Sequence, residues 1–136
     1  LEPAAPLECF AFLEIMFEKC LMIRNLRLNY FNFGDDLDLI TPIIKEGFYR
    51  LAKLSLDGPF GNIVMFLYSA PMPNLQAVSV EFLFHNSTLS NEIICSFALK
   101  CTKLSVVKFD GVLDSSEGIQ KLAGNCCDLE KIVINL

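Results

Sequence analysis

The sequence lacks the marks of a nucleic-acid-binding, metal-binding or membrane-spanning protein. Its 11 lysines and arginines are scattered among 16 aspartates and glutamates, so the basic stripe of a nucleic-acid binder is missing. A single histidine, His85, and the lack of any Cys-x-x-Cys pair argue against a zinc site. No apolar run reaches the ~18 residues of a membrane span, because Glu14, Glu18 and Lys19 interrupt the N-terminal one. We therefore expect no nucleic acid, metal or membrane among its partners.

Further absences bear on chemistry and compartment. No nucleophile can be paired with a base, and no phosphate-binding loop is present, so we expect neither an enzymatic activity nor a cofactor. A signal-peptide pattern is also missing. The six cysteines, at positions 9, 20, 95, 101, 126 and 127, are more typical of reduced, packed thiols than of a disulfide framework. We therefore expect a reducing compartment, cytoplasmic or nuclear. We also expect the chain to be a piece of a longer polypeptide, since it starts without methionine inside a helical pattern.

What the sequence does contain is a repeated apolar frame in a chain that is 53% hydrophobic. The frame has the form apolar-x-x-apolar-x-apolar, and its five copies begin 28, 24, 29 and 25 residues apart. The copies are Ile23, Leu26, Leu28; Leu51, Leu54, Leu56; Leu75, Val78, Val80; Leu104, Val107, Phe109; and Leu129, Ile132, Ile134. Such alternation is what a strand with one buried face produces. It predicts strands near residues 24–29, 52–57, 76–81, 105–110 and 130–135.

An apolar helical face comes before the frame in at least three of the five units. The spacing i, i+3, i+4, i+7 is occupied by Ile119, Leu122, Ala123 and Cys126; by Ile94, Phe97, Ala98 and Cys101; and by Leu13, Met16, Phe17 and Cys20. Each face ends on a cysteine, and we expect these three cysteines to fill the core. Phe10, Phe12 and Phe17 are expected to pack on a preceding unit.

Residues with capping propensity mark where two of the helices start. Thr41 followed by Pro42 predicts an N-cap with proline at the first helical position, and Asp114 with Glu117 resembles a capping box. Helix and strand therefore alternate with a period of about 26 residues. Right-handed crossovers would place the strands side by side in one parallel sheet, with the helices outside.

With these features in hand, the chain resembles the cysteine-containing class of leucine-rich repeats. That class has the pattern G-I/L-x-x-L-A-x-x-C-x-x-L-x-x-L-x-L, which residues 118–134 follow except for isoleucine at the second and third strand anchors. Residues 94–109 and 13–28 match more loosely. The resemblance implies one α/β domain over residues 1–136, with about five repeats. Its fold would be a leucine-rich-repeat solenoid, a horseshoe segment with the parallel β-sheet on the concave face and the helices on the convex face.

The resemblance also implies a function without catalysis. Proteins with such repeats are typically the substrate-recognition arms of F-box or similar ubiquitin-ligase subunits, which is the leading hypothesis here. A related type forms the ligand-sensing or autoinhibitory region of nucleotide-binding immune receptors, which is the alternative. Neither an F-box nor a nucleotide-binding motif is present in these residues. In both hypotheses the chain is a protein-protein interaction scaffold, and its partners are other proteins and the flanking repeats or domains of the same longer polypeptide.

The strand residues between the anchors should point away from the helices, in three rows across the concave face. The candidate partner-binding residues are Arg27, Asn29, Lys53, Asp57, Glu81, Lys108, Asp110 and Lys131. The three acids would lie in adjacent units about 4.8 Å apart, as a negative strip beside a partly basic row. Two interpretations stay open: these residues are polar because they face water, or they bind a basic or mixed-charge peptide segment.

Overall fold

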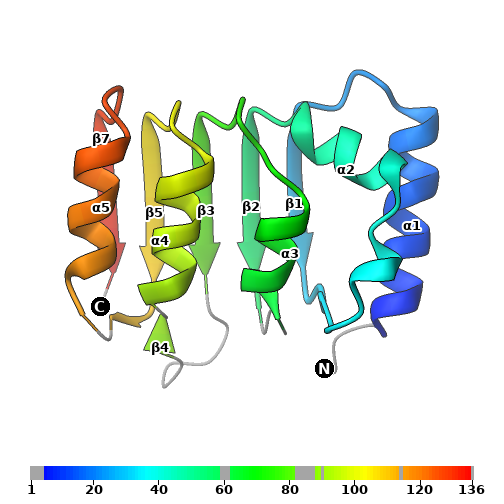
Figure 1. Ribbon diagram of the computed structural model, residues 1–136, viewed down its shortest axis with the longest axis horizontal. Coiled ribbons are helices and arrows are strands. Elements are labelled where there is room, and N and C mark those ends of the chain that lie inside the picture. Colours follow the sequence, from blue (N-terminus) through cyan, green and yellow to red (C-terminus); the bar gives the residue numbers. More distant parts are fainter. Residues whose placement is uncertain (1–4, 59–61, 82–87, 90, 114, 136) are drawn as a thin grey trace.

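The computed structural model describes residues 5–58, 62–81, 88–89, 91–113 and 115–135. Five parallel strands form one open sheet in the order β1-β2-β3-β5-β7 (Figure 1). They are β1 Asn25–Asn29, β2 Lys53–Asp57, β3 Ala77–Glu81, β5 Val106–Asp110 and β7 Lys131–Asn135. Each strand ends at the predicted residue and begins one residue later than predicted. The alternating apolar pattern therefore located all five strands of this sheet.

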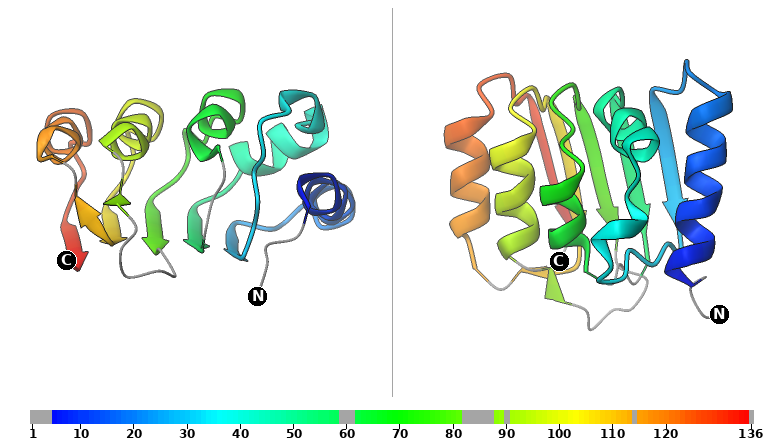
Figure 2. Two further views of the ribbon diagram at one scale, coloured as in Figure 1. Left: turned by 90° about the horizontal axis from the view of Figure 1, so that it is seen from below. Right: turned by 45° about the vertical axis from the view of Figure 1, so that its right-hand side comes forward.

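Each of the five strands follows a helix, so the chain is an α/β protein in which helices alternate with a parallel sheet. The helices are α1 Pro6–Lys19, α2 Pro42–Tyr49, α3 Ile63–Ser69, α4 Asn91–Lys100 and α5 Glu117–Asn125. Helices α2 to α5 all cover the same face of the sheet, and α1 lies past β1 at one end (Figure 2). Within the described ranges, no helix covers the opposite face. No helix there is long and apolar enough for a bilayer crossing either.

All four strand pairs share one continuous register. Leu26 lies opposite Leu54, and the same level continues through Val78, Val107 and Ile132. The buried anchors of the three inner strands pack toward the helices in the core. Ile132 is 39% exposed, because β7 is an edge strand with a neighbour on one side alone. The register therefore places the residues between the anchors in three straight rows.

The predicted helix start at Thr41 is confirmed. The Thr41 hydroxyl accepts a hydrogen bond from the Ile44 N–H at 3.4 Å, and Pro42 occupies the first turn. At α5 the cap is different: the Ser115 hydroxyl accepts from the Glu117 N–H at 3.3 Å. Asp114, predicted to take part there, lies outside the described residues.

Two short elements were not predicted. A 3-10 helix, η1 Leu37–Leu39, follows β1, and the Asp36 carboxylate accepts from the Asp38 N–H at 3.0 Å to cap it. A second, two-stranded parallel sheet pairs β4 Thr88–Leu89 with β6 Val112–Leu113. Both lie in connections between a strand and the next helix, where the unit length varies.

The N-terminal half of the core is built from phenylalanine rings. The Phe66 ring lies 6.1 Å from Phe10, 4.3 Å from Phe33 and 4.8 Å from Phe48, measured between centroids. Phe17 also packs on Phe48, at 5.3 Å. The prediction that the first phenylalanines face a preceding unit is wrong for Phe10 and Phe17. Both are buried against the units that follow them in the chain.

The C-terminal half of the core has a cysteine ladder instead. The Cys126 thiol donates to the Cys101 carbonyl at 3.5 Å, which joins two successive units. Burial, with a smaller contribution from Cys126, raises the pKa of the Cys101 thiol to about 12. Cys20 holds the equivalent place in the first unit but is exposed, so its predicted core position is wrong. Among the described residues, Cys20 follows α1 at the end of the stack, past β1, where no neighbouring unit covers it.

Candidate protein-binding face

The alternating strand residues that point away from the helices form a surface that we call the outer sheet face. It consists of three rows: Asn25, Lys53, Ala77, Val106 and Lys131; Arg27, Ser55, Ser79, Lys108 and Val133; and Asn29, Asp57, Glu81, Asp110 and Asn135. All eight residues predicted to bind a partner lie in these rows. The sheet register therefore brings them onto one surface, although they come from five separate segments.

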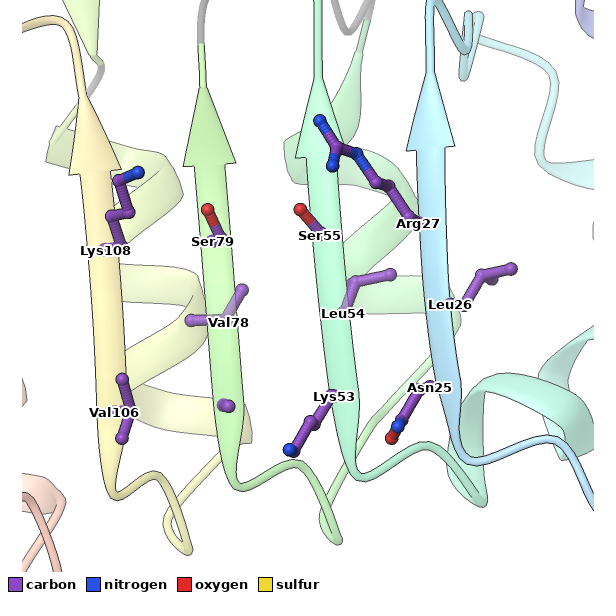
Figure 3. Close-up of a pocket in the computed structure, with 11 residues that line it drawn as sticks. Asn25, Leu26, Arg27, Lys53, Leu54, Ser55, Val78, Ser79, Val106 and Lys108 are labelled. Atoms are coloured by element: carbon purple, nitrogen blue, oxygen red, sulfur yellow. The ribbon is translucent and has the colours of Figure 1, made fainter.

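The outer sheet face contains a hollow of about 440 Å³ over β1, β2, β3 and β5. Arg27, Lys53 and Lys108 line it, and Figure 3 shows these side chains around the short ones of Ser55 and Ser79. Ala77 and Ser79 lie on the middle strand: Ala77 is flanked by Lys53 and Val106, and Ser79 by Ser55 and Lys108. The hollow exists because three short side chains, Ser55, Ala77 and Ser79, lie next to one another between the longer ones of Arg27, Lys53 and Lys108.

The first predicted acid, Asp57, is neutralised within the face. Arg27 extends from β1 over β2 (Figure 3). It donates to the Asp57 carboxylate oxygen Oδ2 from Nε at 3.0 Å and from Nη2 at 2.5 Å. The Arg27 side chain stays 65% exposed, whereas that of Asp57 is 8% exposed. Arg27 Nε also contacts the Asn29 amide oxygen at 3.2 Å. Asp57 is therefore a structural anchor for Arg27 and is not open to a partner.

The acid on β5, Asp110, is also partnered. It accepts a hydrogen bond from the Asn135 amide on β7, and the Lys108 ammonium lies 4.0 Å from its other oxygen. Glu81 between them makes no ion pair within the described residues. The register places the three acids in adjacent units as predicted, but two of them are partnered: Asp57 by Arg27 of the neighbouring strand, and Asp110 by Asn135 of β7 and Lys108 of its own strand.

Lys53 and Lys131 lie in the first row, on strands separated by β3 and β5. Lys53 lines the hollow, whereas Lys131 is exposed on the edge strand outside it. Among the predicted residues, the hollow thus unites Arg27, Lys53 and Lys108. Asn29, Glu81, Asp110 and Lys131 surround it.

Sequence reasoning missed the residues that shape the hollow. Ser55, Ala77, Ser79 and Val106 were placed in the rows but not among the binding residues. Their signal was side-chain size: at adjacent positions of neighbouring strands, two or three short side chains in succession leave a depression. The predicted binding residues had been chosen mainly by charge, which gives no information about side-chain size.

The described residues contain no group of three or more histidine, cysteine, aspartate or glutamate side chains arranged to hold a metal ion. Cys101 and Cys126 are buried and their pKa values are raised, so their thiols are poor nucleophiles. The outer sheet face is therefore the strongest candidate site in this part of the chain. Comparisons with protein-family models, with curated proteins and with solved structures gave no significant match to this chain.

Proposed function

We propose that this chain is a leucine-rich-repeat scaffold that binds another protein on its outer sheet face. One observation carries the proposal: five parallel strands in a single register present a hollowed surface that no described helix covers. A sheet face of this kind leaves its outward side chains free for a partner. Recognition across five strands would also span about 19 Å, since four strand spacings of about 4.8 Å separate β1 from β7.

Three repeated features support the leucine-rich-repeat assignment. The strand starts are separated by 28, 24, 29 and 25 residues, which fits the repeat length of this class. The contact from Cys126 to Cys101 links equivalent positions of successive units. The residue after three of the strands has a positive φ: 60° at Tyr30, 121° at Gly58 and 144° at Gly111, so a left-handed residue follows the strand at the same repeat position in three units. Stacked units of this type form a solenoid, a horseshoe segment in the proposed whole protein.

Binding fits the chemistry of the face better than catalysis does. Arg27 is held by Asp57 of the neighbouring strand, and a preorganised group of this kind loses little conformational freedom when a partner docks. In the family that the sequence resembles, such a surface serves substrate recognition by ubiquitin ligases. We propose the same role here, in a reducing intracellular compartment.

A photo-crosslinking experiment tests the binding surface. A benzophenone amino acid is placed at Ser79 on the outer sheet face, and in a matched control at Lys45 on the helix side. In cell extract we expect a crosslinked protein from position 79 and none from position 45. Equal labelling from the two positions would contradict a binding role for the sheet.

The ubiquitin-ligase role needs its own measurement. Ala77→Arg fills the hollow with a long side chain while leaving the buried anchors untouched. In cells where this variant replaces the wild-type chain, we expect slower turnover of the crosslinked partner. Unchanged turnover would contradict the role in degradation but would not contradict a protein-binding scaffold.

A further inference from the structure

We propose that the outer sheet face binds an acidic, extended peptide segment whose apolar side chain enters the hollow. This inference rests on the proposed function and specifies the partner's chemistry. It replaces the basic or mixed-charge peptide expected from the three acids, two of which have partners in the structure.

The charge of the hollow is opposite to that of the chain. The formal net charge is -5, yet the residues that line the hollow include Arg27, Lys53 and Lys108 and no carboxylate. Lys53 is exposed and makes no ion pair among the described residues. The Lys108 ammonium has one carboxylate neighbour at the limit of contact, 4.0 Å away. Charge complementarity therefore favours carboxylates on the partner.

The floor of the hollow favours an apolar side chain between those carboxylates. Ala77 lies opposite Val106 on the next strand, and neither presents a polar group. The adjacent Ser55 and Ser79 are short enough to leave the floor low. A volume of about 440 Å³ falls within the range of small ligand pockets, so one aliphatic or aromatic side chain fits there.

The two lysines set a spacing for the partner's acids. Lys53 and Lys108 are two strands apart across the sheet and two residues apart along it. Those steps are about 9.6 Å and about 6.6 Å, so their backbones are separated by roughly 12 Å. An extended peptide covers roughly 13 Å in four residues. Acids at positions i and i+4, with the apolar side chain at i+2, therefore match the hollow.

A nucleic acid strand fits this surface less well. Glu81 and Asp110 follow the hollow at the carboxyl ends of the strands, and Asp110 keeps 21% of its side-chain surface exposed. A continuous polyanion that reached the lysines would pass over these carboxylates, whereas a short acidic segment need not.

Selection from a random nonapeptide phage-display library against the immobilised chain tests the inference without choosing the ligand. We expect the enriched peptides to carry Asp or Glu four residues apart with an apolar residue midway. Binding of a labelled, selected peptide should weaken by about tenfold in Lys53→Glu/Lys108→Glu, and more at low salt, where charges are less screened. Ala77→Leu, which raises the floor without a charge, should also weaken it by about tenfold.

The matched control reverses two lysines on the helix side, Lys19→Glu/Lys45→Glu, and should leave binding within about twofold because screened, distant charges contribute little. Circular dichroism melts of all variants confirm that they remain folded. Suppose that the enriched peptides are basic or uncharged and that Ala77→Leu still weakens their binding. That result would contradict the acidic character of the partner but not the proposed function.

Two further outcomes would contradict the peptide partner altogether. No enriched peptide, or peptides insensitive to every outer-face variant, would overturn both this inference and the proposed function. Displacement of the selected peptide by an equal concentration of nine-nucleotide single-stranded DNA would overturn the peptide partner in favour of a nucleic acid.

Discussion

The two halves of the molecule build the same layered architecture with different packing. In the N-terminal half, phenylalanine rings from α1, α2, α3 and the connection between β1 and η1 meet, and the Phe66 ring contacts three others. In the C-terminal half, α4 and α5 stack directly, through the close approach of Gly118 to Ile94 and the thiol contact of Cys126. Regular stacking follows where successive units are alike. In the N-terminal half, where α1, α2 and α3 have 14, 8 and 7 residues, large rings fill the gaps between the helices.

The largest effect is expected from removing the central ring. Phe66→Ala deletes a buried side chain that touches Phe10, Phe33 and Phe48, and should reduce the free energy of unfolding by about 3–5 kcal/mol. Urea denaturation measures the loss, and hydrogen exchange should show it first in α1 and α2. Phe12→Ala is the control, because Phe12 is 64% exposed and should change stability little. Similar losses in the two variants would contradict a ring-based core.

The cysteine ladder should make the C-terminal half sensitive to alkali. The pKa of Cys101 rises from 9.0 to about 12 in the folded chain, so the folded state favours the protonated thiol. The protonated thiol makes its full contribution to the free energy of unfolding below pH 9. As the pH rises from 9 toward 12, this contribution, up to about 4 kcal/mol, is lost. Urea unfolding at pH 8 to 11 should show a weaker pH dependence in Cys101→Ala. Cys20→Ala, at the exposed equivalent, should follow the wild type; parallel curves for all three chains would disprove the thiol's role.

Substitution of one helical glycine in each half compares how tightly the two halves are packed. A Cβ at Gly47 would lie 2.2 Å from Phe17 Cγ, and one at Gly118 would lie 2.8 Å from Ile94 Cβ. Overpacking of this kind costs about 1–3 kcal/mol or more. We expect Gly47→Ala to lower the melting temperature more than Gly118→Ala, because a buried ring inside van der Waals distance must move further. The opposite order would mean that the ring-packed half yields more easily than the stacked half.

The smallest expected effect is a gain in stability rather than a loss. Gly124 lies in α5, and a Cβ there would meet no atom within 4 Å. Gly124→Ala should stabilise the chain by about 0.5 kcal/mol, since alanine loses less backbone entropy on forming a helix. A thermal melt against Gly118→Ala in the same helix separates helix propensity from packing. Destabilisation by both substitutions would show that α5 tolerates no added methyl group.

The strands could be predicted because period-2 alternation depends on local burial alone. Every strand of the five-stranded sheet ends one residue after the last anchor of its frame, and the five copies reinforce one another. The ring cluster was not predictable in the same way. Phe31 and Phe33 lie between β1 and η1, outside the repeated frame, and their packing on Phe10 and Phe66 depends on where that connection runs.

The candidate site was predicted at the level of rows but not of charge. Placing Asp57 and Arg27 on adjacent strands required the register, which the frames supplied. The two hydrogen bonds from Arg27 to one Asp57 oxygen also required Arg27 to extend toward β2, which depends on side-chain conformation and burial. The exposed position of Cys20 likewise depends on what covers a unit, and a pattern within the unit carries no information about that.

The shared register has a consequence for engineering. Each position of the outer sheet face is specified by one residue, and its neighbours on the same strand point into the core. Along each strand, the residues that determine the surface therefore alternate with the residues that form the core. Specificity could be redesigned at the outward positions of β2, β3 and β5, one residue at a time, while the buried anchors keep the scaffold constant.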